Sequence, residues 1–550
     1  MTRKQKALNP NEPLHHADHK RPVSRRDFLA QGFITGTGIV TGPSLLGLLA
    51  GSRNTHAAVS LSPDIVALKT ACGLDVNGGG KIPLICFDLA GGANMIGSNV
   101  LAGGQGGYAE DALSTAGYSK MGIPGDMVPI INSEPGAVPT ATRPGDYTDT
   151  TLGLPFHSDS GFLRGILDKI NDVSVVGSLV NGAVIPARSD NDTSNNPHNP
   201  MYGIYRAGGN GELLPLVGSR SSMSGGNSVA PDALIDSSAL PTKVDRPTDV
   251  TGLVNTGKLV DLLSQEDAVA VMESIQRVSN MKMGNMPTNL TPDAADAVVQ
   301  DLVRCGYVKS ADLVARFGSP DALDPEQDAN ILGASGIFSQ AEWDGRDGGE
   351  FQKTASVMKM VIDGYAGAGT ITMGGFDYHT GERGTGERRD FRAGQCMGAC
   401  LEYAHRTGKP VMIYVFSDGS VASNGTLDNT ADGAGKGVWT GDNSSTAGSF
   451  FLVYNPGRRP VLLSAAPDGM SIHKQIGWFR TSDGSVETAS SPAANNVNLL
   501  VDVLLLNYLA LHGEVGLYNS LFGNSLGDST AMDGLTAFTP ICNGIITNPV

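Results

Sequence analysis

The sequence contains little positive charge and few aromatic side chains. Aromatic residues make up 6% of the 550 positions, and 39 Lys and Arg oppose 55 Asp and Glu, which gives a formal net charge of −16. A chain with this charge is repelled by the phosphates of nucleic acids and by anionic lipid headgroups. We therefore expect no nucleic-acid partner and no binding to anionic membrane surfaces.

Cysteine is also scarce, with six in the whole chain. So few cysteines exclude the disulfide-dense scaffold of small secreted domains. Cys396 and Cys400 lie one helical turn apart, a spacing that suits either a metal pair or small residues on a packed helix face. The packed face is the simpler interpretation.

Long apolar runs are missing after the first 60 residues, so we expect no membrane-spanning segment there. The N-terminus contains "SRRDFLA" at residues 24–30, then a weakly apolar, uncharged stretch and small residues around Ala57 and Ala58. This order is typical of a twin-arginine signal, which we assign to residues 1–58. It predicts the twin-arginine translocase as a partner and a periplasmic or secreted location.

The remaining chain, 59–550, alternates apolar runs with helical patterns and is predicted to be one α/β domain. Buried strands are expected at 82–89, 369–373, 410–416 and 449–456, and residues 161–180 are expected to form a helix followed by a strand. Helices at 351–366 and 390–406 fall between strands, which favours a central, mostly parallel sheet flanked by helices. Apolar residues at helical spacing predict a helical insertion at about 256–345.

Acids and imidazoles cluster where the predicted strands end. In an open parallel sheet these carboxyl ends meet at one edge, where ligands bind. In "GGFDYHT" an extended backbone would place Asp377 and His379 on the same side. We predict Asp377, His379 and Asp418 as ligands of a divalent metal (Zn, Mn, Mg or Ca). The residues expected to line the same site are Asp88, Gly91, Gly92, Asn94, His198 and Asp442.

Several of these residues also have structural interpretations. Asp88 could cap the turn that follows its strand, and neighbouring asparagines could satisfy His198 locally. His157 is most simply a structural loop residue. The basic segment "RGTGERRDFRAG" at 383–394 is either the solvated start of a helix or an anion-binding patch.

Five short segments connect the chain to a known family. "LAGGAN", "LPFHSDSGFLRGIL", "HNPMYGIYRAG", "GGFDYHT" and "VFSDGS" follow the leader in this order. On these segments the chain resembles the exported domain-of-unknown-function family 1501, which is grouped with alkaline-phosphatase-like and sulfatase-like folds. The resemblance implies an alkaline-phosphatase-like fold and a hydrolase of phosphate or sulfate esters. Residues 374–379 match the family's Gly-Gly-Trp-Asp-Thr-His motif.

The chain departs from this pattern where catalysis would need it most. Asn94 occupies a position that is Ser, Asp or Asn in the family, and an amide cannot act as a nucleophile. Asp442 matches the aspartate of a later Asp-His-Gly motif without its histidine, and "SDG" at 417–419 lacks the histidine of Ser-Asp-His-Gly. Two functions therefore remain open: a metal-dependent hydrolase, or a non-catalytic protein that binds a small molecule or glycan or assists assembly of a surface complex.

Overall fold

The chain divides into two compact units in a computed structural model. The smaller unit lies within Met1–Asp75 and Thr251–Ala322, and the larger within Val76–Val250 and Leu323–Val550. The predicted twin-arginine leader lies outside the described residues. The structure describes residues 60–72, 79–129, 147–189, 196–254, 263–284, 293–317, 320–463 and 472–550.

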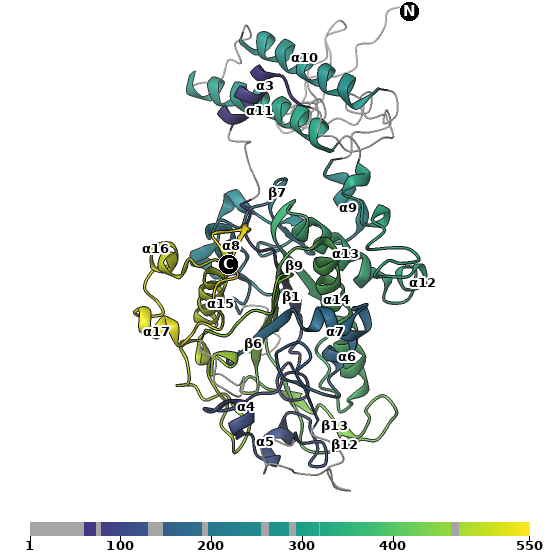
Figure 1. Cartoon of the computed structure of the whole chain (residues 1–550), viewed down its shortest axis with the longest axis vertical. Coiled ribbons are helices and arrows are strands. Elements are labelled where there is room, and N and C mark those ends of the chain that lie inside the picture. The colour runs from purple at the N-terminus through teal and green to yellow at the C-terminus, as the bar shows by residue number, and fades with distance from the viewer. Residues whose placement is uncertain are drawn as a thin grey trace, which may run out of the picture. The chain divides into compact units, whose positions relative to one another are not determined.

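A seven-stranded sheet forms the centre of the larger unit (Figure 1). From β10 to β8 all neighbouring strands pair in parallel, whereas β15 is antiparallel to both of its neighbours. The predicted α/β fold with a mostly parallel central sheet is therefore confirmed. The strands in spatial order are β6 (Val180–Pro186), β15 (Gly448–Tyr454), β10 (Val411–Phe416), β1 (Leu84–Leu89), β9 (Ala366–Met373), β7 (Leu214–Gly218) and β8 (Thr242–Lys243).

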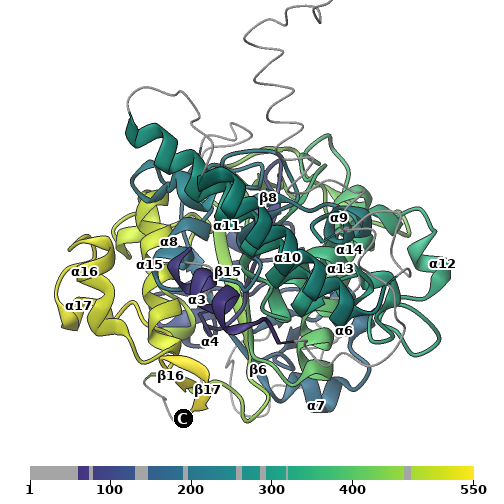
Figure 2. The same ribbon diagram turned by 90° about the horizontal axis from the view of Figure 1, so that it is seen from above.

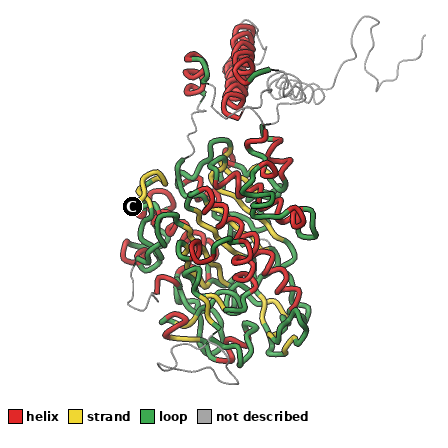
Figure 3. Tube along the Cα trace, turned by 45° about the vertical axis from the view of Figure 1, so that its right-hand side comes forward, coloured by secondary structure: helices red, strands yellow, loops and turns green. Residues whose placement is uncertain are grey.

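Helices cover both faces of this sheet. Figures 1 and 2 show α6 (Gly161–Lys169), α13 (Gly348–Ile362) and α14 (Gly384–Thr407) on one side, with α8 (Met201–Arg206) and α15 (Val497–Leu511) on the other. Figure 3 shows the strands between these helical layers. The other helices of this unit are α4 (Gly107–Glu110), α5 (Thr115–Lys120), α7 (Val173–Gly177), α12 (Gln340–Trp343), α16 (Tyr518–Phe522) and α17 (Ser529–Asp533), and α9 (Pro247–Gly252) spans the boundary between the units.

Five two-stranded ribbons are built from the loops. Two of them, β11 with β14 and β12 with β13, follow β10 along the chain, and β14 carries Asp442. The ribbons are β2 (Gly103–Gly104) with β3 (Asp111–Ala112), β4 (Thr148–Asp149) with β5 (Phe156–His157), β11 (Val421–Ala422) with β14 (Gly441–Asp442), β12 (Leu427–Asp428) with β13 (Lys436–Gly437), and β16 (Cys542–Asn543) with β17 (Ile545–Pro549).

The central strand β1 has the composition that its position requires. A parallel strand covered by helices on both faces cannot alternate between polar and apolar residues. All six residues of β1, "LICFDL", are buried. On one face, Leu84 and Cys86 join a core cluster that includes Leu504 and Leu505 of α15.

Glycines allow α6 and α14 to pack backbone against backbone. A Cβ atom on Gly165 would lie 2.0 Å from the carbonyl oxygen of Phe391, and one on Gly394 would lie 2.2 Å from that of Phe162. Cys396 and Cys400 lie in this buried part of α14 with no exposed surface. Burial raises the pKa of Cys396 to about 12, so its thiol stays protonated and is a poor metal ligand. The packed-face interpretation of this pair thus agrees with the structure.

The expectation for residues 161–180 was wrong after the first helix. Residues 173–177, within the stretch expected to continue from the helix into a strand, form the short helix α7. The Asp172 side chain explains the difference because it accepts a hydrogen bond from the Val175 amide and caps the helix. The strand β6 begins only at Val180.

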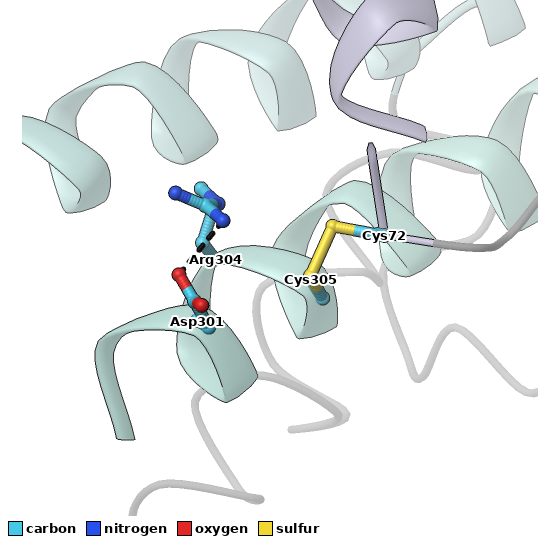
Figure 4. The surroundings of a disulfide bond; sticks show 4 residues. All are labelled: Cys72, Asp301, Arg304 and Cys305. Atoms are coloured by element: carbon cyan, nitrogen blue, oxygen red, sulfur yellow. Dashed lines mark ion pairs between the residues drawn. A yellow bond between two sulfur atoms is a disulfide. The ribbon is translucent and has the colours of Figure 1, made fainter. Parts of the chain in front are cut away.

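Among its described residues, the smaller unit contains three helices: α3 (Pro63–Ala71), α10 (Gln265–Gly284) and α11 (Asp293–Phe317). The two long helices lie inside the predicted insertion at 256–345, and the chain after Ala322 belongs to the larger unit. A disulfide joins Cys72, just after α3, to Cys305 of α11, near the Asp301–Arg304 ion pair (Figure 4). Six cysteines in a long chain suggested no disulfide framework, so this pairing was not predicted.

Buried apolar contacts and ion pairs attach α3 to the two long helices. Ile65 is fully buried in a small cluster that contains Met272 of α10 and Val308 of α11. Arg277 of α10 contacts both carboxylate oxygens of Asp64, at 2.7 and 2.8 Å. Among the described residues, no helix has the length and apolar character to cross a membrane.

A buried histidine connects α15 to the start of β1 and makes stability depend on pH. His512 Nδ1 donates to the Tyr508 carbonyl at 2.7 Å, and its Nε2 accepts from the Ile82 amide at 2.9 Å. Nε2 can accept this bond only in the neutral ring, and burial lowers the pKa of His512 to about 4. The unfolded chain therefore takes up a proton at higher pH than the folded chain.

We predict that the wild type loses stability relative to His512→Gln as the pH falls from about 6.5 to about 4, by up to about 1.4 kcal/mol per pH unit. His512→Gln removes the titrating ring and should have the flatter profile, although it is less stable at neutral pH. Denaturant unfolding of both proteins between pH 4 and 7 checks this. A difference in unfolding free energy that does not change with pH would contradict the buried neutral imidazole.

The disulfide predicts a thiol count and a stability change. Denatured, unreduced protein should show four reactive thiols, because Cys86, Cys396, Cys400 and Cys542 are free, and reduction should release two more.

Replacing Cys72 and Cys305 by serine should destabilise the smaller unit by about 2–4 kcal/mol. Calorimetry with and without reductant measures this loss. The double-serine variant provides the control, since reductant should not change its unfolding, and six reactive thiols before reduction would refute the pairing.

Candidate functional site

The loops after β1, β9 and β10 meet at one edge of the sheet. The side-chain hydroxyl of Ser417, next to β10, donates to the Leu89 carbonyl at 2.5 Å and accepts from the Gly92 and Ala93 amides at 3.0 and 2.9 Å. This hydroxyl fixes the turn after β1 against the end of β10. The predicted convergence of the strand ends is present in the structure.

Three of the predicted residues form a compact group at this edge. Asp377 and His379 lie in the loop after β9, and Asp442 ends β14. His379 Nε2 lies 2.5 Å from Asp377 Oδ1 and 3.2 Å from Asp442 Oδ1. One ligand atom from each residue lies within 4.8 Å of the other two. We refer to Asp377, His379 and Asp442 as the acidic triad.

The acidic triad has the chemistry of an open divalent-cation site. Two carboxylates and one imidazole form a donor set that suits Zn²⁺ or Mn²⁺, and catalytic zinc sites typically have three protein ligands and one open position. The side chains of Asp377, His379 and Asp442 are 54%, 29% and 34% exposed, so a ligand can approach from solvent. The donor set therefore fits the expected metal.

Asp418, predicted as the third ligand, has a different position. Its side chain is buried, and its Oδ1 accepts a hydrogen bond from the Gly91 amide at 3.2 Å. It is absent from the group of ligand atoms within 4.8 Å of one another, where Asp442 stands instead. Gly91 lies between Asp418 and the acidic triad. Its amide contacts Asp418, and a Cβ atom on it would lie 2.3 Å from the Asp377 nitrogen. With φ near +124°, this glycine lets the loop after β1 approach the loop after β9.

Asp88 is fully buried and bonded to a neighbouring loop. Its Oδ2 accepts from the amides of Asn227 at 2.6 Å and Ser228 at 2.9 Å, and its Oδ1 accepts from the Ser228 hydroxyl at 3.1 Å. Burial raises the pKa of Asp88 to about 6, a rise that the nearby Asp418 charge supports and these hydrogen bonds oppose. Asp88 thus holds the loop at 219–231 against the sheet edge and is not a member of the acidic triad.

Asn94 and Gly92 lie in the loop after β1 and contact segments near the acidic triad. The Asn94 amide donates to the Tyr378 hydroxyl at 3.0 Å, and its Oδ1 accepts from the Ser98 hydroxyl at 2.7 Å. Its Nδ2 is buried and has no hydrogen-bond partner among the described residues. Gly92 approaches Ser420 closely, since a Cβ atom there would lie 3.4 Å from the Ser420 main chain. These contacts connect the loop after β1 to the segments that carry His379 and Asp442.

His198 is a buried, neutral residue of the same region. Its ring stacks on Phe416, with centroids 5.6 Å apart, and its Nε2 lies 2.9 Å from the Ser189 hydroxyl. Burial lowers the pKa of His198 to about 3. Its Nδ1 has no hydrogen-bond partner within the described part of the chain. The ring packs over the end of β10 and is not a member of the acidic triad.

Sequence reasoning missed the loop that contacts Asp88. Asn227 and Ser228 follow Gly225 and Gly226 in "SRSSMSGGNSVAP". A Cβ atom on Gly226 would lie 2.7 Å from Asp88 Oδ2, so only glycine permits this approach. The Gly-Gly pair signals a tight turn in the sequence, but no local pattern indicates which strand end it meets.

No protein-family model matches this chain, and neither a curated protein nor a solved structure does. The interpretation of the site therefore depends on its geometry and on the resemblance of the five segments.

Metal binding can be tested on the chelator-treated full chain by titration calorimetry with Zn²⁺, Mn²⁺, Mg²⁺ and Ca²⁺. Because each residue of the acidic triad offers one ligand atom, His379→Ala and Asp442→Asn should each weaken the tightest binding by at least about tenfold, or about 1.4 kcal/mol. Asp533→Asn, an exposed acid on α17, is the matched control and should bind like the wild type. A larger loss in Asp418→Asn than in Asp442→Asn would favour Asp418 as the ligand and refute the triad.

Proposed function

We propose that this protein is an exported, divalent-metal-dependent hydrolase of phosphate or sulfate esters. The observation that carries the proposal is the acidic triad at the carboxyl edge of a mostly parallel sheet. The five family-like segments support the same class, since they resemble proteins with alkaline-phosphatase-like and sulfatase-like folds. The twin-arginine leader supports export to the periplasm or beyond, with the translocase as the partner during transit.

Asp377, His379 and Asp442 would hold the cation in this proposal. A bound divalent cation neutralises the charge that develops on an ester oxygen and makes water more acidic. The partial exposure of the three side chains leaves a solvent-facing side for the ester. The two carboxylates of the triad attract the cation, and the triad itself attracts an anionic ester only once the cation is present.

The attacking group in this proposal is water. Asn94 carries an amide, which is not a nucleophile. The Ser417 hydroxyl is engaged with three main-chain groups, and the buried Ser98 hydroxyl donates to Asn94. Water reaches the acidic triad directly because its side chains are exposed. Hydrolysis without a covalent enzyme intermediate is therefore the mechanism that the arrangement favours.

The alternative function is a non-catalytic protein that binds a small molecule or glycan through a bound cation. The hydrogen bonds of Asp88 to Asn227 and Ser228 favour it, because they occupy a carboxylate that could otherwise serve a second cation. This alternative keeps the acidic triad as a ligand site and assigns it no turnover.

The test is hydrolysis of aryl phosphates and aryl sulfates by mature protein from an exporting host, with each divalent cation added in turn. We expect chelator-sensitive turnover that falls at least about a hundredfold in His379→Ala and Asp442→Asn, since the loss of one good charge-stabilising contact costs about 10²–10³ in rate. Asp533→Asn should retain the wild-type rate.

Metal binding without turnover would favour the binding protein, and a protein with neither property would refute both functions. A purified protein that still carries the leader and fractionates with the cytoplasm would contradict export.

A further inference from the structure

A large cavity in the larger unit lies beside the loop of the acidic triad. Its volume is about 990 Å³, and it is bounded by α14, the segment at 341–351 and the turn at 431–434. Gly374, which follows β9, is part of its wall. Gly374 and Asp377 are three residues apart, so their Cα atoms are separated by at most about 11 Å. One extended ligand could therefore contact both the cavity and the triad.

The cationic residues that line this cavity are all arginines. Thr385, Arg388, Arg389, Arg392 and Gln395 line it from α14 at helical spacing, so they occupy one face of the helix. Arg164 and Arg346 complete a set of five arginines. Planar guanidinium groups bind phosphate, sulfate and carboxylate groups through paired hydrogen bonds.

Acidic residues also line the cavity, but cations outside its lining contact three of them. Lys169 pairs with Glu342, and Lys353 with Glu350 at 2.9 Å. Glu387 contacts Arg383 at 2.8 Å and Lys436 at 2.9 Å, besides Arg164. Two of these outside cations contact further acids: Lys436 contacts Asp159, and Lys169 contacts Asp168. The lining itself holds five arginines and five acids, so its formal charges balance, and the four cations outside it engage three of those acids.

Arg389 is the arginine best placed to accept a ligand. Arg388 pairs with Asp432 and Arg392 with Asp347, whereas Arg389 has no carboxylate within 4.0 Å among the described residues. Its guanidinium lies against Gly375, where a Cβ atom would be 2.3 Å from Nη1. Partial burial, followed by the charge of Arg392, lowers the pKa of Arg389. A bound anion would relieve both effects.

We propose that this arginine cavity binds a second anionic group of the substrate, so that the substrate is an ester with at least two phosphate, sulfate or carboxylate groups. One group would face the acidic triad while another contacts Arg389, whose guanidinium lies against Gly375. The proposal rests on the proposed function for the reacting group, whereas anion binding in the cavity does not require a metal.

Calorimetric titration of the chelator-treated full chain with inorganic pyrophosphate tests the cavity alone. We expect binding that weakens at least about tenfold in Arg389→Gln, because hydrogen bonds to charged groups are among the stronger polar contacts. Arg389→Lys should retain part of the affinity. Arg458→Gln, an exposed arginine after β15, is the matched control and should bind like the wild type. Equal binding by Arg389→Gln, or no binding by the wild type, would overturn the proposal.

A kinetic measurement links the cavity to turnover. In the metal-loaded protein, Arg389→Gln should raise the KM for an aryl bisphosphate by about tenfold or more, while Arg458→Gln leaves it unchanged. An unchanged KM in Arg389→Gln would refute the cavity as part of the substrate site.

The two proposals can fail separately. If no ester is hydrolysed with any cation but the chelator-treated protein binds pyrophosphate through Arg389, the proposed hydrolase is wrong and the anion site stands. If aryl phosphates are hydrolysed but pyrophosphate does not bind the chelator-treated protein, the cavity proposal is wrong and the hydrolase stands.

Discussion

The parallel pairing of β1 with β9 and β10 is the constraint on which the rest of the structure depends. It places the ends of three strands, distant in the sequence, at one edge of the sheet. Ser417 then fixes the loop after β1 against the end of β10. The acidic triad depends on this arrangement, since two of its members follow β9 and the third belongs to a ribbon that follows β10.

Burial separates the acids at this edge into two kinds. Asp88 is enclosed and hydrogen-bonded, and its raised pKa shows that desolvation outweighs the three hydrogen bonds that it accepts. Asp377 and Asp442 are partly exposed and lie around an imidazole. The buried acid therefore organises the backbone, while the exposed acids are free to exchange their present contacts for a cation. The arginine cavity reaches Gly374, three residues from Asp377.

The sequence located most of the central strands and part of the site, but it did not predict β7 and β8 at the sheet edge. Apolar runs bounded by glycine and acid located β1, β9, β10 and β15, and the alternation of a strand identified Asp377 and His379 as a pair. The prediction of Asp418 as a metal ligand was not supported. Tertiary packing decides whether a carboxylate at a strand end points outward or bonds to a neighbouring loop. The pairing of Cys72 with Cys305 and the contact of Asn227 with Asp88 also join segments far apart in the chain, and no local pattern encodes them.

The disulfide spans 233 residues, and the chain that it encloses includes β1, β6, β7 and β8 as well as α10. These elements therefore belong to a covalent ring closed through two sulfur atoms. A protease that cuts once inside this ring produces two polypeptides that remain attached to each other until the disulfide is reduced. In an extracellular setting, a cut in an exposed loop of the ring would open the chain without releasing a fragment, and the folded sheet could keep its strands together.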